Sequence, residues 1–304
     1  MTPEEQQRAK QGVLLAIGAY TMWGIAPIYF KTISDVSPLE ILSHRVVWSF
    51  FLLAALLHFG RRWRGVRDVL KSKIKMTYLL ATSIVIAANW LIFIWAVNTN
   101  HMLDASLGYY INPLINVLLG MLFLGERLRK MQWFAVVLAS CGVLVQLIAF
   151  GSVPVVAIVL ALSFGCYGLL RKKVSLDAQT GLFIETLILL PAAAIYLLWI
   201  ADSSTSDLMA NPITLNLLLI SAGVITTLPL LCFTGAATRL KLSTLGFFQY
   251  IGPSLMFLLA VLVYGEAFTV DKAITFAFIW GALVVFSVDG LRSNRKIRKT
   301  VTEK

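Results

Sequence analysis

The feature that most constrains this chain is a run of about 20 apolar residues that recurs along its length, with short polar or basic segments in between. As an α-helix, a run of that length crosses the hydrocarbon core of a bilayer. The runs lie near residues 12–30, 41–59, 77–97, 104–124, 131–149, 153–170, 178–200, 213–236, 244–264 and 273–290. They predict an all-α polytopic membrane protein with ten transmembrane helices.

The composition supports a membrane protein over a soluble domain. Of the 304 residues, 59% are hydrophobic and 13% are charged, whereas soluble domains carry about 45–50% apolar and about 25% charged residues. A membrane β-barrel would instead show strands of about ten residues with alternating hydrophobicity, and the sequence lacks that alternation.

The positions of the basic residues predict the orientation. The net charge is +11, which on its own would suggest a nucleic-acid partner. If the chain starts in the cytoplasm, 23 of the 26 Lys and Arg fall in cytoplasmic segments, and two, Lys31 and Lys272, fall outside. This is the asymmetry of the positive-inside rule. We therefore expect both termini to be cytoplasmic and no nucleic-acid partner, with binding through the basic segment 60–75 as a minor alternative.

The first run and the cysteines indicate no processing or cross-linking. The first run covers residues 12–30 without an Ala-x-Ala exit, so we interpret it as a retained span and not as a signal peptide. Cys141, Cys166 and Cys232 fall inside proposed spans, where cysteine acts as a small apolar side chain. We expect no disulfide, no metal site and no cofactor.

The two halves of the chain resemble each other. The stretches ASLGYYINPLINVLLGMLFLGE and TLGFFQYIGPSLMFLLAVLVYGE each place a proline twelve residues before Gly-Glu, at an offset of 140 residues. WGIAPIYFK in span one and FGCYGLLRK in span six match at an offset of 141. Spans one to five therefore correspond to spans six to ten.

Because five is odd, the second half enters the membrane with the opposite polarity, as in many secondary transporters. We predict an inverted five-plus-five repeat. Its parts are a cytoplasmic lead (1–11), a first five-helix repeat (12–149), a second five-helix repeat (153–290) and a basic cytoplasmic tail (291–304).

These residues resemble the EamA family of the drug/metabolite transporter superfamily, whose five-plus-five repeat ends its fourth and ninth spans with Gly-Glu. The resemblance covers nearly the whole chain, and it is carried by ILSHRVVWSF, NWLIFIWAVN, ASLGYYINPLINVLLGMLFLGER and LSTLGFFQYIGPSLMFLLAV. It implies a ten-helix transporter of the bacterial inner membrane that exports small molecules. One member of the family is associated by name with chloramphenicol resistance, so a chloramphenicol-like drug is a candidate substrate.

Three prolines inside spans predict helix breaks: Pro27, Pro113 and Pro253. Each leaves the carbonyl four residues earlier without its helical donor. In a bilayer such a carbonyl needs protein, water or a ligand as its partner. Spans one, four and nine are therefore the best candidates to line a central cavity.

Span four carries a polar stripe. Tyr109, Asn112, Asn116 and Gly120 recur at intervals of three and four residues, which places them on one helix face. Two interpretations stay open. The stripe faces the substrate, or it packs against other helices, where Asn forms hydrogen bonds and Gly permits close approach.

Aromatic and amide side chains on spans one, three and nine complete the candidate substrate-binding set. Such a mixture would stack on a flat amphipathic ligand while the amides orient it. For the third-span Trp and the ninth-span Tyr, helix packing or an interfacial belt is the alternative. These candidates are Trp23, Tyr29, Asn89, Trp90, Gln249 and Tyr250.

Ionisable groups inside the spans are the candidates for coupling or gating: His44, Arg45 and Glu185. Glu185 follows Arg45 by 140 residues, so the two occupy corresponding places in opposite leaflets and are not expected to pair. Glu185 is the candidate for a coupling proton. The alternatives are that Arg45 extends to the membrane surface and that Glu185 and His44 are structural.

The function that fits best is a secondary active transporter that exports small amphipathic organic molecules by alternating access. Its partners would be the substrate, membrane lipid and a coupling proton. The alternative is a membrane-embedded enzyme acting on a lipid or small amphipath. No GxxxxGK, HExxH or GxSxG motif occurs, so we expect no enzyme and assign no catalytic residue. A channel would require a TVGYG-like filter or a charged ring, and neither pattern appears.

Overall fold

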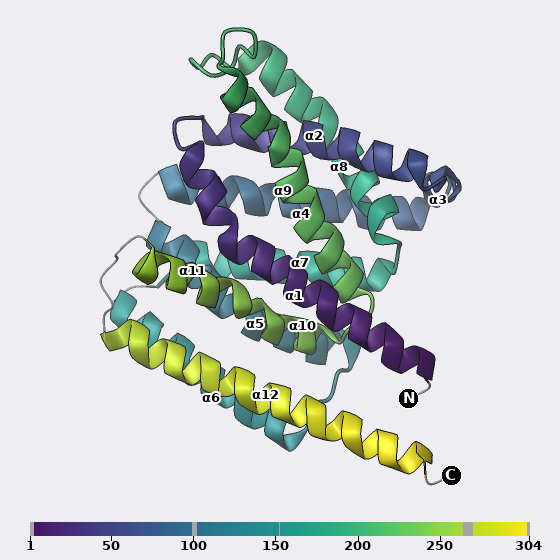
Figure 1. Cartoon of the computed structure of the whole chain (residues 1–304), viewed down its shortest axis with the longest axis vertical. Helices are drawn as coiled ribbons and strands as arrows, with labels where there is room; N and C mark the ends of the chain where they lie inside the picture. The colour runs from purple at the N-terminus through teal and green to yellow at the C-terminus, as the bar shows by residue number, and fades with distance from the viewer. Residues whose placement is uncertain (1–2, 99–101, 152, 264–269, 303–304) are drawn as a thin grey trace.

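The computed structural model describes residues 3–98, 102–151, 153–263 and 270–302, and every regular element within these ranges is helical (Figure 1). In chain order the helices are α1 (Pro3–Thr32), α2 (Pro38–Phe59), α3 (Trp63–Leu70), α4 (Lys73–Asn98), α5 (Met102–Leu124), α6 (Lys130–Phe150), α7 (Val155–Val174), α8 (Ala178–Ile195) with the π-helical turn η1 (Tyr196–Ile200), α9 (Ile213–Ala237), α10 (Leu242–Gln249), α11 (Ile251–Leu262) and α12 (Val270–Thr302). The all-α fold class is confirmed.

Ten segments of the described chain are long and apolar enough to cross a membrane, and they fall on the ten predicted runs. The seventh span is α8 with η1, and the ninth is α10 with α11. The short helix α3 is not a span. It lies in the basic segment 60–75 and buries Val66 and Val69. The first helix begins at Pro3, so the charged lead continues the helix of span one.

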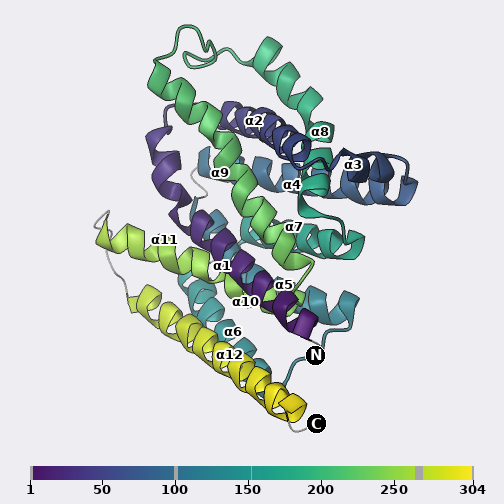
Figure 2. The ribbon, with the colours of Figure 1, turned by 45° about the vertical axis from the view of Figure 1, so that its right-hand side comes forward.

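The main contacts between spans have counterparts in the two halves. Helix α5 packs on α7 as α11 packs on α1, and α9 packs on α1 as α4 packs on α7. Three pairs of spans that occupy the same place in the two predicted repeats also pack directly on each other: α2 on α8, α5 on α10, and α6 on α12. Figure 2 shows the last pair side by side at one edge of the bundle.

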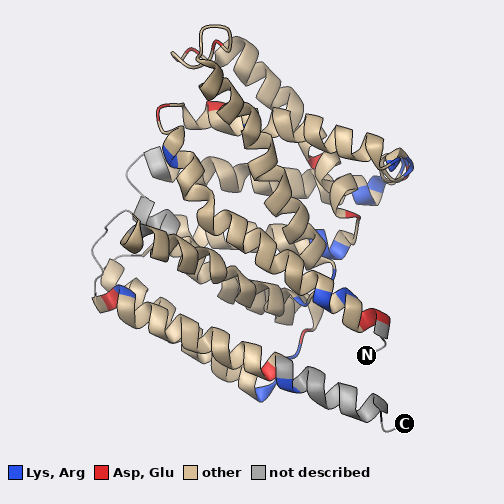
Figure 3. Cartoon of the chain, viewed as in Figure 1, with Lys and Arg blue, Asp and Glu red and all other residues tan. Residues whose placement is uncertain are grey.

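Helix α1 begins and α12 ends at the same end of the bundle, and α3 lies at this end too (Figure 1). We refer to it as the terminal end. Most Lys and Arg of the described residues gather there, as Figure 3 shows. The opposite end carries Lys31 and Lys272, so the charge asymmetry that the sequence predicts is a property of the folded bundle.

Span nine is divided just before Pro253. Helix α10 ends at Gln249, and α11 follows after Tyr250. Pro253 has no N–H to offer the Gln249 carbonyl. The Tyr250 N–H bonds the carbonyl of Phe247, three residues earlier, at 3.3 Å, which is a tighter turn than that of an α-helix. The two parts of the ninth span therefore meet at a local break.

Other prolines lie inside helices that continue. Helices α1 and α5 run through Pro27 and Pro113 without division. Pro191 lies inside α8, which passes into the π-helical turn η1 shortly afterwards, and Pro229 lies inside α9.

Helices α2 and α9 approach each other so closely at Gly223 that no side chain fits between them. A Cβ atom at this position would lie 2.6 Å from the carbonyl carbon of Trp48 and 2.8 Å from the backbone nitrogen of Ser49. The Ser49 hydroxyl donates a 3.2 Å hydrogen bond to the Gly223 carbonyl. The opposing atoms belong to the backbone, which cannot turn aside as a flexible side chain can.

Gly223→Ala should therefore lower the free energy of unfolding by about 1–3 kcal/mol, the usual cost of overpacking a close contact. Gly281→Ala on α12 is the matched control, because a Cβ atom there meets only Leu138 Cδ1, at 4.0 Å. Thermal unfolding of both purified variants in one detergent provides the comparison. Equal unfolding temperatures would show that α2 and α9 are not held this closely.

Candidate substrate cavity

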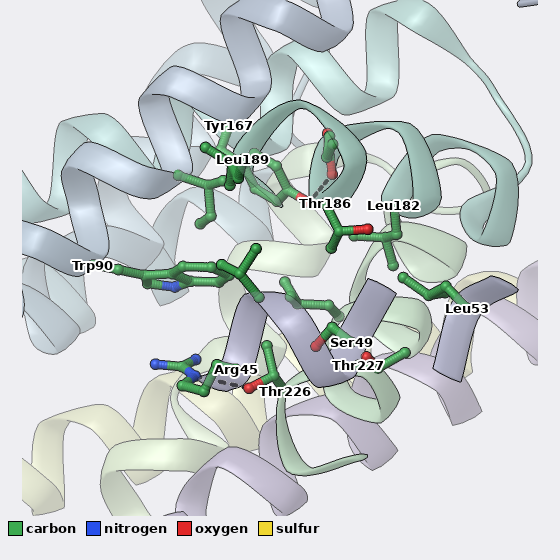
Figure 4. Close-up of a pocket in the computed structure, with 14 residues that line it drawn as sticks. Arg45, Ser49, Leu53, Trp90, Tyr167, Leu182, Thr186, Leu189, Thr226 and Thr227 are labelled. Carbon is green, nitrogen blue, oxygen red and sulfur yellow. Dashed lines mark hydrogen bonds between the residues drawn. The ribbon is translucent and has the colours of Figure 1, made fainter. Parts of the chain in front are cut away.

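A cavity lies inside the bundle between α2, α4, α7, α8 and α9 (Figure 4). It measures about 20 Å³, and a single water molecule needs about 10–15 Å³ on the same measure. Its lining comes from both halves of the chain: Arg45, Val46, Ser49, Leu53, Ile86 and Trp90 from the first, and Tyr167, Leu182, Glu185, Thr186, Leu189, Thr226, Thr227 and Leu230 from the second. A larger solute can therefore enter only when the helices move apart.

Arg45 of α2 is held among aromatic rings. Its Nε donates a 2.7 Å hydrogen bond to the Thr226 hydroxyl of α9. Its guanidinium carbon lies 4.6 Å from the ring centre of Trp90 and 5.8 Å from that of Phe30. Such contacts stabilise a cation that has lost its water. Arg45 forms no ion pair with any carboxylate of the described residues.

Glu185 of α8 has a cation and two hydroxyl groups around it. Its Oε1 lies 3.6 Å from Nη1 of Arg171 on α7 and accepts a 2.5 Å hydrogen bond from Thr82 of α4. Its Oε2 accepts a 3.2 Å bond from the Tyr167 hydroxyl. The Arg171 and Glu185 side chains are only 1% and 4% exposed. The carboxylate charge is therefore compensated inside the protein.

Arg45 and Glu185, which stand 140 residues apart in the predicted repeat, thus line one cavity. They do not pair within the described structure, as expected from the sequence, because the partner of Glu185 is Arg171. Figure 4 shows Trp90 beside the Arg45 guanidinium and Tyr167 on the other side of the cavity from Arg45.

Among the predicted substrate-binding residues, Trp90 lines the cavity. Its neighbour Asn89 instead joins α4 to α7, donating from Nδ2 to the Leu160 carbonyl at 3.0 Å and to the Ser163 hydroxyl at 2.8 Å. Trp23 of α1 lies in an aromatic cluster with α7 and α9. Its ring centre is 5.7 Å from that of Tyr20 and 5.8 Å from those of Phe164 and Phe233.

Three predicted amides meet where α5 crosses α10. Asn116 Nδ2 donates a 2.9 Å hydrogen bond to Gln249 Oε1 and lies 3.5 Å from Asn112 Oδ1. At the same crossing, a Cβ atom on Gly246 would lie 2.7 Å from the Pro113 carbonyl oxygen. These contacts fit the packing interpretation of the polar stripe. Substrate binding by these amides stays a prediction.

The remaining predicted residues also contact other helices. The Tyr29 hydroxyl donates to a carbonyl of α9 at 2.9 Å, and that of Tyr250 to a carbonyl of α5 at 3.3 Å. Tyr109 packs edge to face on Phe93 of α4, with ring centres 6.1 Å apart. His44 Nδ1 accepts a 3.2 Å hydrogen bond from an indole one turn later in α2.

A wider cavity of about 350 Å³ opens at the terminal end, between α1, α9 and the turn from α7 to α8. Its charged lining residues are three arginines, Arg8, Arg62 and Arg239, and one aspartate, Asp177. Arg62 and Asp177 form an exposed ion pair at 3.3 Å. Positive charge therefore predominates at this opening.

Comparison with known proteins assigns the family. Residues 10–148 match the EamA-like transporter family. The chain is also 74% identical over 299 residues to an "Uncharacterized transporter" of Vibrio cholerae, which covers 98% of this chain and 99% of that protein. The chain belongs to the EamA-like transporter family. It is therefore a multi-pass membrane transporter of the drug/metabolite kind.

Within the EamA-like family, the chain is of the RarD type. It is 59% identical to "Protein RarD" of Escherichia coli, over 97% of this chain and 100% of that protein. It is 35% identical to "Chloramphenicol-sensitive protein RarD" of Pseudomonas aeruginosa, over 94% and 96% of the two chains. A solved crystal structure with 18% identity has the same fold, with a TM-score of 0.74 over 93% of this chain and 98% of that one.

In this EamA-like transporter, the Gly-Glu pair that ends span four connects it to span nine. Gly125 has a φ angle of +62°, which glycine adopts without strain, and the chain turns back there. The Glu126 carboxylate then accepts hydrogen bonds from the Leu242 N–H at 2.6 Å, the Ser243 N–H at 2.9 Å and the Ser243 hydroxyl at 2.6 Å. A carboxylate at a helix N-terminus satisfies free N–H groups and suits the helix dipole.

Lys172 of α7 adds a second contact at the terminal end. Its ammonium group donates to the carbonyl of Ala237, the last residue of α9, at 3.2 Å and to that of Leu240 in the connection to α10. At the terminal end, contacts thus join spans four and six to spans eight and nine. The matching pair Gly265 and Glu266 lies outside the described residues.

Sequence reasoning missed Arg171, because it stands in a basic cluster at a helix end that positive-inside charge explains. The sequence nevertheless contains a pattern that could have identified Arg171. The turn between α7 and α8 is centred near residue 176, so Arg171 and Gly181 stand five residues before and after it, opposite each other in the hairpin. A Cβ atom on Gly181 would overlap the Arg171 guanidinium, and Glu185 follows one helical turn later.

Proposed function

We propose that the chain is a secondary active transporter of the bacterial inner membrane that exports small amphipathic organic molecules by alternating access, with both termini in the cytoplasm. One observation carries this proposal. Two ionisable residues at corresponding positions of the two halves, Arg45 and Glu185, line a single cavity inside the membrane-spanning bundle. Ionisable groups are costly at that depth and usually mark a transport pathway.

The helix packing supports an inverted repeat. Pairs such as α5 with α7 and α11 with α1 are those expected if spans one to five and spans six to ten are two copies of one arrangement. Two such copies can exchange their conformations, which opens a central site first to one side and then to the other. A cavity of only about 20 Å³ fits an intermediate that is closed on both sides.

The candidate substrates are drugs or metabolites with an apolar body and a few polar groups. The cavity supports this class, because its lining combines the Trp90 ring and several leucines with residues that carry hydroxyl and ionisable groups. A chloramphenicol-like molecule is among the candidates, in line with the name of the P. aeruginosa relative. In this proposal Glu185 carries the coupling proton, and neither a catalytic residue nor a cofactor takes part.

Transport by purified protein in liposomes tests this function. Radiolabelled chloramphenicol and a panel of amphipathic drugs are offered, with and without an imposed pH gradient, and protein-free liposomes serve as the control. We expect saturable movement of at least one compound that responds to the gradient. The alternative, a membrane-embedded enzyme, would release a chemically changed product without net movement of the substrate, and that result would overturn the proposal.

The topology predicts opposite accessibility of two exposed loops. In a variant without the three native cysteines, Ser204→Cys should react with an impermeant thiol reagent on intact spheroplasts. Lys71→Cys, near the end of α3, should react only after permeabilisation, because its segment carries the cytoplasmic charge. Both residues are exposed. Labelling of both positions in intact spheroplasts would exclude the proposed orientation.

A further inference from the structure

The charges around the central cavity do not balance. Its lining contains two ionisable side chains, Arg45 and Glu185. Arg171 compensates Glu185 at 3.6 Å. Arg45 has no carboxylate partner among the described residues, and the hydrogen bond from its Nε to Thr226 is the one its guanidinium makes within them. Arg45 is therefore the lining cation that has no carboxylate partner within the described residues.

The two terminal nitrogens of the Arg45 guanidinium form no hydrogen bond with the described residues and can therefore bind a ligand. A planar guanidinium binds a carboxylate through two parallel hydrogen bonds, a geometry that lysine cannot reproduce. Aromatic rings at 4.6 Å and 5.8 Å stabilise the cation in part, but they supply no negative charge.

A second polar group in the cavity also lacks a partner. Thr227 is only 1% exposed and lines the cavity beside Thr226, and its hydroxyl forms no hydrogen bond with the described residues. A buried hydroxyl without a partner is unfavourable unless a ligand or water satisfies it. It stands on the same helix, α9, as the threonine that holds Arg45.

The wider cavity at the terminal end also has a predominantly positive lining. Its lining combines three arginines with one aspartate, and that aspartate is already paired with Arg62. A cleft lined by one sign of charge raises the local concentration of oppositely charged solutes. Both cavities therefore favour anions, although different residues form them.

We propose that the substrate is an amphipathic organic acid, whose carboxylate is bound by Arg45 with the Thr227 hydroxyl as a further donor. The apolar body of the acid then lies against Ile86, Leu182 and Leu189. This inference rests on the proposed transport function and specifies its substrate class.

Equilibrium binding of acids and their neutral amides tests the proposal. The probes are three matched pairs: phenylacetate with phenylacetamide, indole-3-acetate with indole-3-acetamide, and octanoate with octanamide. Binding of each radiolabelled probe is measured on purified protein in lipid nanodiscs. We expect at least one acid to bind about tenfold or more tightly than its amide, which corresponds to about 1.4 kcal/mol.

Variants identify the residue responsible. Arg45→Met should abolish the preference for the acid, and Arg45→Lys should retain a weaker one, because the charge remains but the planar group is lost. Arg64→Met, which removes an exposed arginine of α3, should leave the preference unchanged. Thermal unfolding verifies that each variant is folded, and Arg45→Lys provides the comparison if Arg45→Met does not fold.

Three results would overturn the proposal: equal binding of acids and amides, binding of none of the acids, or a preference that persists in Arg45→Met. A failure of the organic-acid proposal can be distinguished from a failure of the proposed transport function. Saturable flux of neutral amphipaths without a preference for acids would leave the transport function intact and reject the organic acid. An Arg45-dependent preference for acids without flux would support the organic acid as the ligand and reject the transport function.

Discussion

Replacing Arg171 by methionine is expected to lower the free energy of unfolding by about 3–5 kcal/mol, a large part of the stability of a typical domain. The two charges lie 3.6 Å apart and are almost fully buried. Removing the cation leaves the Glu185 carboxylate in an apolar interior with two hydroxyl groups as partners. An unpaired buried charge costs more than the pair itself contributes.

Thermal unfolding in detergent measures this loss. The double variant Arg171→Met with Glu185→Gln should recover most of it, because a neutral amide can accept from one of the two hydroxyl groups and donate to the other without requiring a cation. Arg62→Met removes a partner from the exposed ion pair with Asp177, whose side chains are 55% and 47% exposed. It should change the stability by no more than about 1 kcal/mol. A similar loss in the Arg171 and Arg62 variants would show that Arg171 is solvated and not paired.

The second large effect is expected from Glu126→Ala, which removes the carboxylate that connects span four to α10. Hydrogen bonds to a charged group contribute about 1.5–3 kcal/mol each, and in the open state water replaces part of them. We expect the closed state of the terminal end to lose about 2–3 kcal/mol, so its ratio to the open state falls roughly 30- to 150-fold. The variant should still fold, because the substitution lies at the edge of the contact between span four and α10 and not in its interior.

The rate of thiol labelling measures this shift. Leu119→Cys is placed on α5 at a site that is 7% exposed, in a protein without the native cysteines. Its labelling rate should follow the population of the open state and rise in the Glu126→Ala variant. Asp68→Ala, which removes an exposed carboxylate of α3, is the control and should leave the rate unchanged. An equal rate in all three proteins would mean that the Glu126 contact does not hold this end closed.

The spans were predictable because a membrane helix depends on the length and apolar composition of its own segment, which the sequence shows directly. Arg45 and Glu185 could be selected for a related reason, since an ionisable residue within such a run is conspicuous. Their partners could not be selected. Glu126 meets residues 116 and 117 positions later, and no local pattern indicates which helix N-terminus a carboxylate will cap.

The effect of the prolines depended on tertiary packing in the same way. The residue type predicts a missing hydrogen bond at Pro27, Pro113 and Pro253 alike. Only the ninth span is divided near its proline, whereas α1 and α5 are not. Neighbouring helices determine whether such a weakened turn opens. The amino-acid sequence does not show which helices those neighbours are.

The divided ninth span has a consequence for the cycle of the transporter. Gly246 precedes Pro253 by seven residues, whereas Gly108 in the matching SLGYY motif precedes Pro113 by five, so the second half carries two extra residues at the point where α10 and α11 separate. The halves are therefore unequal, and exchanging their shapes cannot give two end states of the same free energy. Under the proposed alternating access, the empty protein should favour one of its two end states, and a solute arriving from the other side should bind with an affinity reduced by the fraction of molecules that face it.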